Sequence, residues 1–317
     1  LIAHLPAYAA WASRAPWLLN LRNTLPGAAW LGEKLLGLSA QRSLPTWRSD
    51  TFWRSAESFA SAEETLRRAA AGERVAVLFV DTFNGTFETE NALSAARVLK
   101  AAGYTVHTLS KADGHHCCGR TYLAGGMVEE AKAKAGALID ALLPFAQAGV
   151  AIVGLEPSCL LTLRDETLVM GFGEKARTVA AQALMFEEFI ARESKAGRFA
   201  LRLKAADAPI LLHGHCHQKA FGAVSPILEV LKLIPGAKPE LIESSCCGMA
   251  GSFGYEASHH AVSMRMAEES LLPAIRKQPD AIVVADGTSC RHQIADGAQR
   301  DAVHVARLLA RLLIDEQ

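Results

Sequence analysis

The chain has 317 residues, half of them hydrophobic and 21% charged, which is long enough for two domains with apolar cores. Its 33 basic and 33 acidic residues cancel, so no overall field attracts nucleic acid or an anionic membrane. No apolar run approaches the ~18 residues that cross a bilayer, and no secretory signal pattern is present. These features predict a cytoplasmic protein. The first residue is Leu1 rather than methionine, which is typical of a processed product or of a piece of a longer polypeptide.

Residues 1–72 differ in composition from the rest of the chain. All five tryptophans lie here, between prolines, which predicts short helices interrupted by proline, acting as a linker or docking segment. The simpler interpretation is that these aromatic side chains pack on the core of this chain. The alternative is an exposed surface that docks another domain, a subunit or a membrane face. The tryptophans are Trp11, Trp17, Trp30, Trp47 and Trp53.

Strands and helices then alternate in two similar rounds. For a first domain at 73–200, the pattern predicts strands at 75–79, 104–109 and 150–155 and helices at 88–102 and 127–146. A helix around 174–195 is expected to connect the halves. For a second domain at 201–317, it predicts strands at 209–212, 239–242 and 281–285 and helices at 224–233 and 260–275. The fold class is therefore α/β, with two tandem domains of mostly parallel sheet flanked by helices.

Six of the seven cysteines form two matching sets. Cys-Cys-Gly occurs at 117–119 and again at 246–248, and Ser-Cys follows each copy, ending at Cys159 and at Cys290. Every cysteine group comes directly after a predicted strand. Because the carboxyl ends of parallel strands meet at one edge of a sheet, loops that are distant in sequence are expected to meet there. The gaps between them hold one helix and one strand each.

The seventh cysteine, Cys216, lies where a further ligand of the second set is expected, so that set has four thiols, Cys216, Cys246, Cys247 and Cys290. Four thiolates suit a [4Fe-4S] cluster or a tetrahedral zinc ion. Adjacent cysteines span one small ion poorly because their side chains diverge, whereas two irons of a cluster can take one each, which favours iron-sulfur. Two alternatives are a redox-active vicinal disulfide, whose ring is strained, and inert buried thiols.

The first set has only Cys117, Cys118 and Cys159, since 81–83 reads Asp-Thr-Phe where the counterpart of Cys216 would be. Two interpretations stay open. Either His115, His116 or Asp81 completes a metal site, or this half is an empty copy that keeps its fold.

Histidines crowd around the cysteines. We expect them to hydrogen-bond to thiolates or sulfides, or to relay protons, rather than to act as catalytic bases. The histidines are His115, His116, His213, His215, His217 and His292. No dinucleotide fingerprint, phosphate loop, zinc-protease motif or nucleophile elbow is present, so no organic cofactor site is expected in this chain.

These motifs resemble the cysteine-rich CCG-domain family of iron-sulfur oxidoreductases. The family includes one of the subunits of heterodisulfide reductase, the glycolate oxidase iron-sulfur subunit and the C-terminal part of FAD-linked D-2-hydroxyacid dehydrogenases of the D-lactate or D-2-hydroxyglutarate type. The segments at 215–219 (His-Cys-His-Gln-Lys) and 245–251 are most similar to the dehydrogenase branch. The family pattern ends in Cys-x-x-Cys, but Thr162 and Gln293 stand at its last position here.

The resemblance implies an iron-sulfur electron-transfer module or subunit. Its partners would be a flavin-containing dehydrogenase domain or subunit that carries FAD, and a ferredoxin-like iron-sulfur segment. Electrons would pass to a quinone or another acceptor, which implies a peripheral position on the inner membrane as the alternative to a purely cytoplasmic one. The alternative functions are a zinc-stabilised interaction or scaffold domain and a heterodisulfide-reductase-like thiol-disulfide oxidoreductase.

Overall fold

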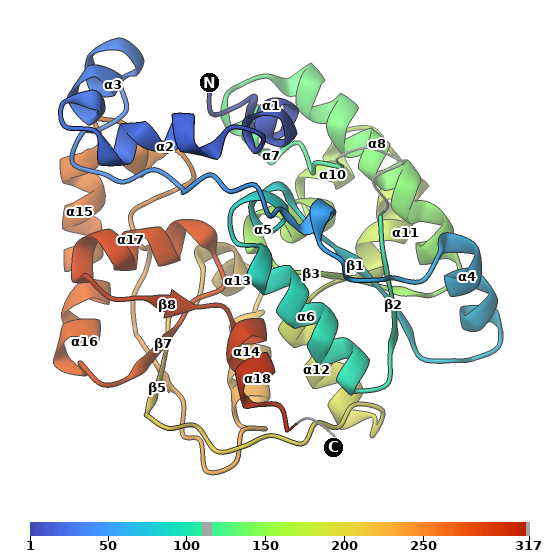
Figure 1. Ribbon diagram of the computed structural model, residues 1–317. Coiled ribbons are helices and arrows are strands. Elements are labelled where there is room, and N and C mark those ends of the chain that lie inside the picture. Colours follow the sequence, from blue (N-terminus) through green and yellow to red (C-terminus); the bar gives the residue numbers. More distant parts are fainter. Residues whose placement is uncertain (110–115, 315–317) are drawn as a thin grey trace.

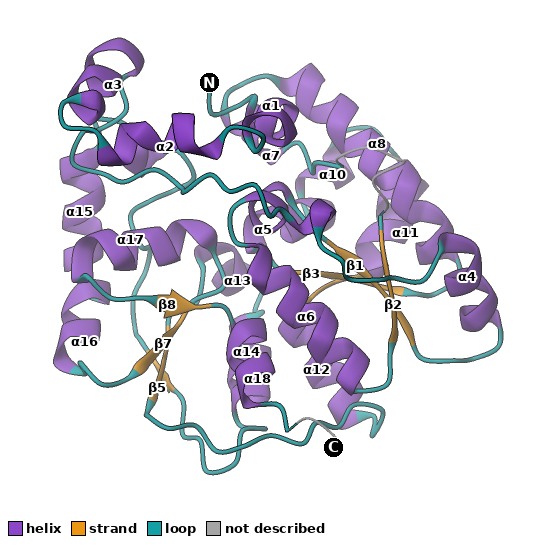
Figure 2. Cartoon of the chain, in the orientation of Figure 1, coloured by secondary structure: helices purple, strands orange, loops and turns teal. Residues whose placement is uncertain are grey.

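Two four-stranded parallel sheets form the protein, and both have the same strand order. The structure is a computed structural model that describes residues 1–109 and 116–314. The orders are β2-β1-β3-β4 and β6-β5-β7-β8, so each half repeats one topology. Figure 2 shows the strands in two groups with helices around each. All pairings are parallel and helices flank both sheets, which confirms the predicted α/β class.

The first sheet separates two layers of helices. Its strands are β1 (Val75–Phe79), β2 (Thr105–Thr108), β3 (Ala151–Gly154) and β4 (Ala183–Met185). Ala76 and Leu78 face α6 (Thr89–Ala101) and α12 (Phe186–Lys195), whereas Val77 and Phe79 face α8 (Val128–Gln147) and α11 (Glu174–Gln182). Both faces are covered, which is why β1 reads as a continuous apolar run rather than an alternating one.

The second sheet is built in the same way from shorter strands. These are β5 (Ile210–Leu212), β6 (Glu240–Leu241), β7 (Ile282–Val284) and β8 (Ala302–Val303). Leu212 and Val284 share a core with α14 (Val224–Leu231) and α18 (Val305–Leu312). Leu211 and Val283 pack instead with α15 (His260–Glu268), α16 (Leu271–Lys277) and α17 (Thr288–Ala298).

One hydrophobic core is shared by the two halves. Helix α18 packs against α6, and α12 packs against α14, so these four helices lie between the two sheets (Figure 1). The domain boundaries at 72/73 and 200/201 stay predictions.

Two predicted helices are each two helices in the structure. The expected helix at 174–195 is interrupted by β4, which pairs with β3 at the edge of the first sheet. Its sequence, Ala-Leu-Met, is a short apolar run, and such a run suits a strand as well as a helix. The expected helix at 260–275 breaks between Glu268 and Leu271 into α15 and α16. Strand β8 was not predicted.

Short helices form the N-terminal segment, as expected. They are α1 (Leu5–Ala12), α2 (Pro16–Thr24) and α3 (Ala28–Leu36). Prolines occupy the first turns of α1 and α2, where the backbone N–H that proline lacks would have no partner within the helix. The one-turn helix η1 (Phe52–Arg54) and α4 (Ala62–Ala70) lead into β1. No helix among the described residues is long and apolar enough to span a bilayer.

The five tryptophans separate into two groups. Trp47 packs edge-on against Phe87 with ring centroids 4.8 Å apart, and Trp53 contacts Phe52. The other three, Trp11, Trp17 and Trp30, are 73%, 70% and 59% exposed. The interpretation that all five cover the core of this chain is therefore wrong for these three.

Candidate metal centre

The second cysteine set lies at the carboxyl ends of three neighbouring strands. Cys216 is the first residue of α13 (Cys216–Ala220), which follows β5. Cys246 and Cys247 lie in the loop after β6, and Cys290 lies in the first turn of α17 after β7. Since β6, β5 and β7 are adjacent in the sheet, their loops converge on one edge.

The four sulfurs form one continuous group. The Cys290 and Cys247 sulfurs are 3.4 Å apart. Cys246 is within hydrogen-bonding reach of both Cys247 and Cys216. None of the four is in a disulfide. Cys247 and Cys290 are buried, Cys246 is partly buried and Cys216 is exposed, so the group runs from the core to the surface.

The sulfurs compete for protons. Hydrogen bonds from Cys216 and Cys247 lower the pKa of Cys246 well below its ordinary value, and a hydrogen bond from Cys247 does the same for Cys290. The same contacts raise the pKa of Cys216 and of Cys247. Four thiolates this close need a cation to balance their charge, so the donor set fits a metal ion or metal cluster.

The glycine of each Cys-Cys-Gly motif is required by the backbone. Gly119 has φ +85° and Gly248 has φ +87°. A Cβ on Gly119 would lie 2.4 Å from the Ala131 carbonyl oxygen of α8, and one on Gly248 would lie 2.2 Å from the Ser263 oxygen of α15. Both glycines also donate their N–H to the first sulfur of the motif, at 3.4 Å to Cys117 and 3.3 Å to Cys246. The motif thus holds each cysteine pair against a helix.

Two of the predicted histidines lie beside the sulfurs of the second set. His213 lies with Cys247 and Cys290, with candidate ligand atoms within 4.8 Å of one another. His215 caps α13 through Nδ1, which accepts from the His217 N–H and lies 3.9 Å from the Cys216 sulfur. His213 therefore fits the expected role of hydrogen bonding to a thiolate, since it lowers the pKa of Cys290. The His215 Nδ1 is an acceptor and can only accept a hydrogen bond from a protonated Cys216.

His217 and His292 bond to groups other than sulfur. The His217 Nε2 is 3.3 Å from the Arg120 guanidinium, and burial together with His215 and Arg120 lowers the pKa of His217 to about 4. His292 Nδ1 is 2.5 Å from the Tyr255 hydroxyl. His116 is partly buried directly before Cys117, and His115 lies outside the described residues.

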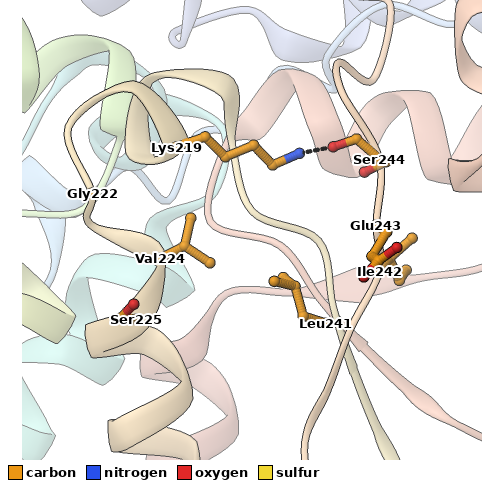
Figure 3. A pocket seen from close by; sticks show the side chains of 8 residues that line it. All are labelled: Lys219, Gly222, Val224, Ser225, Leu241, Ile242, Glu243 and Ser244. Atoms are coloured by element: carbon orange, nitrogen blue, oxygen red, sulfur yellow. Dashed lines mark hydrogen bonds between the residues drawn. The ribbon is translucent and has the colours of Figure 1, made fainter.

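Lys219 also faces the sulfurs, although no sequence motif assigned it a role. Its ammonium donates to the carbonyl oxygens of Ser244 and Ser245, the latter at 3.0 Å, and so ties α13 to the loop that carries Cys246 (Figure 3). Burial lowers the pKa of Lys219, and the nearby cysteine sulfurs oppose this shift. Its position three residues after Cys216, one helical turn away, was the available signal. It lines a pocket of about 270 Å³.

The first cysteine set has the same framework with three thiols. Cys117 and Cys118 precede α7 (Arg120–Ala124), and Cys159 lies in α9 (Pro157–Leu160). All three are buried, and Cys118 is within hydrogen-bonding reach of the other two. Thr82, the first residue of α5 (Thr82–Thr86), takes the place of Cys216, and its side chain hydrogen-bonds to Cys117.

Asp81, a candidate ligand of this first set, caps α5 instead. Its carboxylate accepts from the Phe83 N–H at 2.9 Å and from the Asn84 side chain at 2.6 Å. Burial, reinforced by Glu156, raises the pKa of Asp81 to about 6. Its oxygens thus have partners within the chain, and metal binding by this set stays a prediction.

Polar side chains that sequence reasoning missed connect the two cysteine sites. Glu88 accepts from Arg291 at 2.7 and 2.6 Å and from the Thr288 hydroxyl at 2.6 Å. Glu156 accepts from the Thr288 N–H at 2.9 Å. Helix α9 also contacts α13, so the two sites adjoin. Three short helices follow the cysteine loops in the sequence. After Cys159 come η3 (Leu161–Arg164) and α10 (Glu166–Val169), and after Cys247 comes η4 (Phe253–Tyr255).

This fold and these loops define a duplicated α/β protein with one cysteine site in each repeat. The chain belongs to the cysteine-rich CCG domain family, whose pattern matches residues 81–164 and 210–295. This confirms the resemblance drawn from the motifs, and each matched segment covers the cysteine loops of one repeat.

The similar proteins are dehydrogenases or dehydrogenase subunits by name. One subunit of the anaerobic glycerol-3-phosphate dehydrogenase of Escherichia coli is 26% identical over 302 residues, which cover 93% of this chain and 72% of that protein. D-2-hydroxyglutarate dehydrogenase of Escherichia coli is 25% identical over 301 residues, 93% of this chain but only 28% of that enzyme. The Pseudomonas putida enzyme of the same name is 28% identical over 243 residues, 74% of this chain and 22% of that enzyme.

Proposed function

We propose that this protein is an iron-sulfur electron-transfer module or subunit of a flavin-linked dehydrogenase. It would relay electrons from reduced FAD, held on a partner domain or subunit, toward a quinone or another acceptor. The observation that carries this proposal is the group of four free thiols at one sheet edge, each in contact with the next. Membership of the CCG family and similarity to named dehydrogenases support it.

The donor set fits a [4Fe-4S] cluster held by Cys216, Cys246, Cys247 and Cys290. When bound, such a cluster accepts and releases one electron at a time. Cys247 and Cys290 would anchor it in the core, and the exposed Cys216 would mark the side that an electron donor or acceptor approaches. The Gly248 N–H on the Cys246 sulfur and the nearby Lys219 ammonium both favour added negative charge, which raises a reduction potential.

The second candidate function is a zinc-stabilised interaction domain. One observation favours it, namely that His213, Cys247 and Cys290 can offer ligand atoms within 4.8 Å of one another, a mixed nitrogen and sulfur set that zinc accepts. Cys246 is within hydrogen-bonding reach of Cys247 and is the candidate fourth ligand. The first cysteine set is proposed to be architectural.

Metal analysis under anaerobic conditions tests the proposal. Protein purified or reconstituted without oxygen is expected to contain about four irons and four sulfides per chain and to show a cluster EPR signal on reduction. Cys216→Ser is expected to lose most of the iron. Cys159→Ser, the matched change in the other set, is expected to keep it. Equal iron in wild type and Cys216→Ser contradicts the proposal, and colourless protein with one zinc per chain supports the second candidate.

A further inference from the structure

The N-terminal helices carry a concentrated exposed apolar surface. Helices α2 and α3 bury none of their residues. They lie on the outside of the molecule, beside α15 and α17 (Figure 1). The main members of this surface, called here the tryptophan surface, are Trp11, Trp17, Trp30, Leu31, Leu35 and Leu36, each at least 50% exposed. Monomeric proteins rarely leave such a patch open without a use for it.

Helix α2 is oriented with its polar side toward the protein. The Asn20 side chain bonds twice to the Trp47 backbone, through its amide nitrogen to the carbonyl oxygen and through its oxygen to the N–H, each at 2.9 Å. Asn23, one turn later, bonds in the same way to Leu44. Arg22 donates to the Ser39 oxygen. Because these contacts hold the polar side inward, Trp17 and the α2 leucines are held outward.

The segment is firmly attached to the second half. Arg42 is fully buried and pairs with Asp296 at 3.1 Å. The Ser39 N–H donates to the backbone carbonyl oxygen of Tyr255 at 2.8 Å. Leu38 forms an isolated antiparallel β-bridge with Glu256. The exposure of the tryptophan surface is therefore a consequence of specific packing, and its position relative to the Cys216 site is fixed.

The charge of this segment differs from that of the neutral chain. Residues 1–49 contain five basic residues and one acidic residue, Glu33. Two of the basic residues, Arg42 and Arg48, pair with acidic residues outside this range. The Glu33 carboxylate accepts from the Ala40 N–H at 2.7 Å, so it is engaged within the protein. Arg14 and Lys34 are exposed beside the tryptophans, with no ion pair among the residues that the structure describes, and Arg14 lies over the Trp11 ring. An anionic surface would therefore complement the charge of this segment, although the chain as a whole has no net charge.

We propose that the tryptophan surface binds an anionic phospholipid bilayer, with α1 to α3 lying in the interface and the tryptophans inserted among the headgroups. Helices that lie in a membrane interface typically combine exposed tryptophan and leucine with lysine and arginine, and they are too short to cross the bilayer. Helices α1 to α3 have this composition. A second copy would bring the same basic residues against this surface, whereas an anionic bilayer offers acidic headgroups and an apolar interior together. The inference does not depend on the proposed cluster.

Vesicle co-sedimentation of the full chain, as purified without oxygen, tests this. Wild type is expected to bind phosphatidylcholine vesicles containing one-quarter phosphatidylglycerol, to bind pure phosphatidylcholine more weakly, and to lose affinity as salt is raised. A variant with Trp11→Ser, Trp17→Ser and Trp30→Ser is expected to bind at least about tenfold more weakly, since it loses the inserted aromatic area. The control variant replaces three exposed apolar residues elsewhere, Val128, Val169 and Leu233, by serine and is expected to bind like wild type.

Circular dichroism and metal content establish that both variants are folded and carry the same metal as wild type, so loss of vesicle binding with unchanged metal content separates this inference from the cluster proposal. The membrane proposal is overturned if the tryptophan variant binds vesicles like wild type. It is also overturned if wild type ignores vesicles but forms dimers that the tryptophan variant does not form, because the surface then pairs two copies. Binding to a flavin-containing partner protein but not to vesicles would also overturn the membrane proposal.

Discussion

At the scale of single residues, Thr82 and Cys216 account for the difference between the two cysteine sites. Thr82 begins the short helix that follows β1, and Cys216 begins the short helix that follows β5. Each contacts the first cysteine of the Cys-Cys-Gly motif in its own half. The surrounding backbone is otherwise repeated, including the left-handed glycines at 119 and 248. One hydroxyl in place of one thiol therefore separates a three-thiol site from a four-thiol site.

Restoring that thiol should create a second metal site. Thr82→Cys places a sulfur next to Cys117 in a position of similar volume, so the iron content of anaerobically reconstituted protein is expected to rise from about four to about eight per chain. Thr82→Val, which removes the hydroxyl without adding sulfur, is the control and should leave the iron content unchanged. An unchanged iron content in Thr82→Cys would show that the first set does not accept a cluster even with four thiols.

At the scale of elements, each Cys-Cys-Gly motif is a turn that joins a strand to a helix. The loops were predictable because every cysteine group follows a strand, and parallel strands bring their carboxyl ends together. The division of 174–195 and 260–275 was not predictable from periodicity. The apolar residues of β4 fit either structure, and only pairing with β3 makes this segment a strand.

The contacts made by Glu88, Glu156 and Arg291 were equally beyond sequence reasoning. They join residues that are far apart in the sequence and depend on how the two halves pack. The sulfur contacts themselves followed from topology, whereas these polar contacts followed from the packing of one repeat on the other.

The glycine of the second motif should tolerate no side chain. Gly248→Ala combines a left-handed φ with a Cβ only 2.2 Å from the Ser263 oxygen, so a loss of more than about 3 kcal/mol in unfolding free energy is expected, with loss of iron. Gly251→Ala, in the same loop, shares the positive φ but meets nothing within 4 Å, and about 1 kcal/mol is expected there. Urea unfolding of both metal-free variants measures the difference, and equal losses would show that the contact with α15 is unimportant.

At the scale of the whole molecule, four packed helices and a buried ion pair join the two halves. The shared core places α6, α12, α14 and α18 between the sheets. Above it, Glu88 from the first half pairs with the buried Arg291 guanidinium, which also donates to the carbonyl oxygens of Ala285 and Asp286 at 2.7 Å. Removing one partner leaves the other charge buried without compensation, which is costly in a way that an exposed pair is not. The relative position of the two cysteine sites therefore depends on Glu88.

This ion pair should make stability depend on acid pH. Burial alone would raise the pKa of Glu88, but Arg291 outweighs it and lowers the pKa from 4.5 to about 2. The carboxylate therefore stabilises the folded state fully above pH 4.5, by about 3 kcal/mol for a shift of this size. This stabilisation is lost as the pH falls from about 4.5 to about 2.

Replacing Glu88 by glutamine should remove this pH dependence. In Glu88→Gln, metal-free protein is expected to lose about 3 kcal/mol at pH 7 and to show a shallower decline in acid, measured by urea unfolding at about pH 7, 4 and 3. Glu90→Gln breaks a more exposed pair with Arg48 and should cost less than about 1 kcal/mol. An acid decline in Glu88→Gln as steep as in wild type would place the pH-sensitive contact elsewhere.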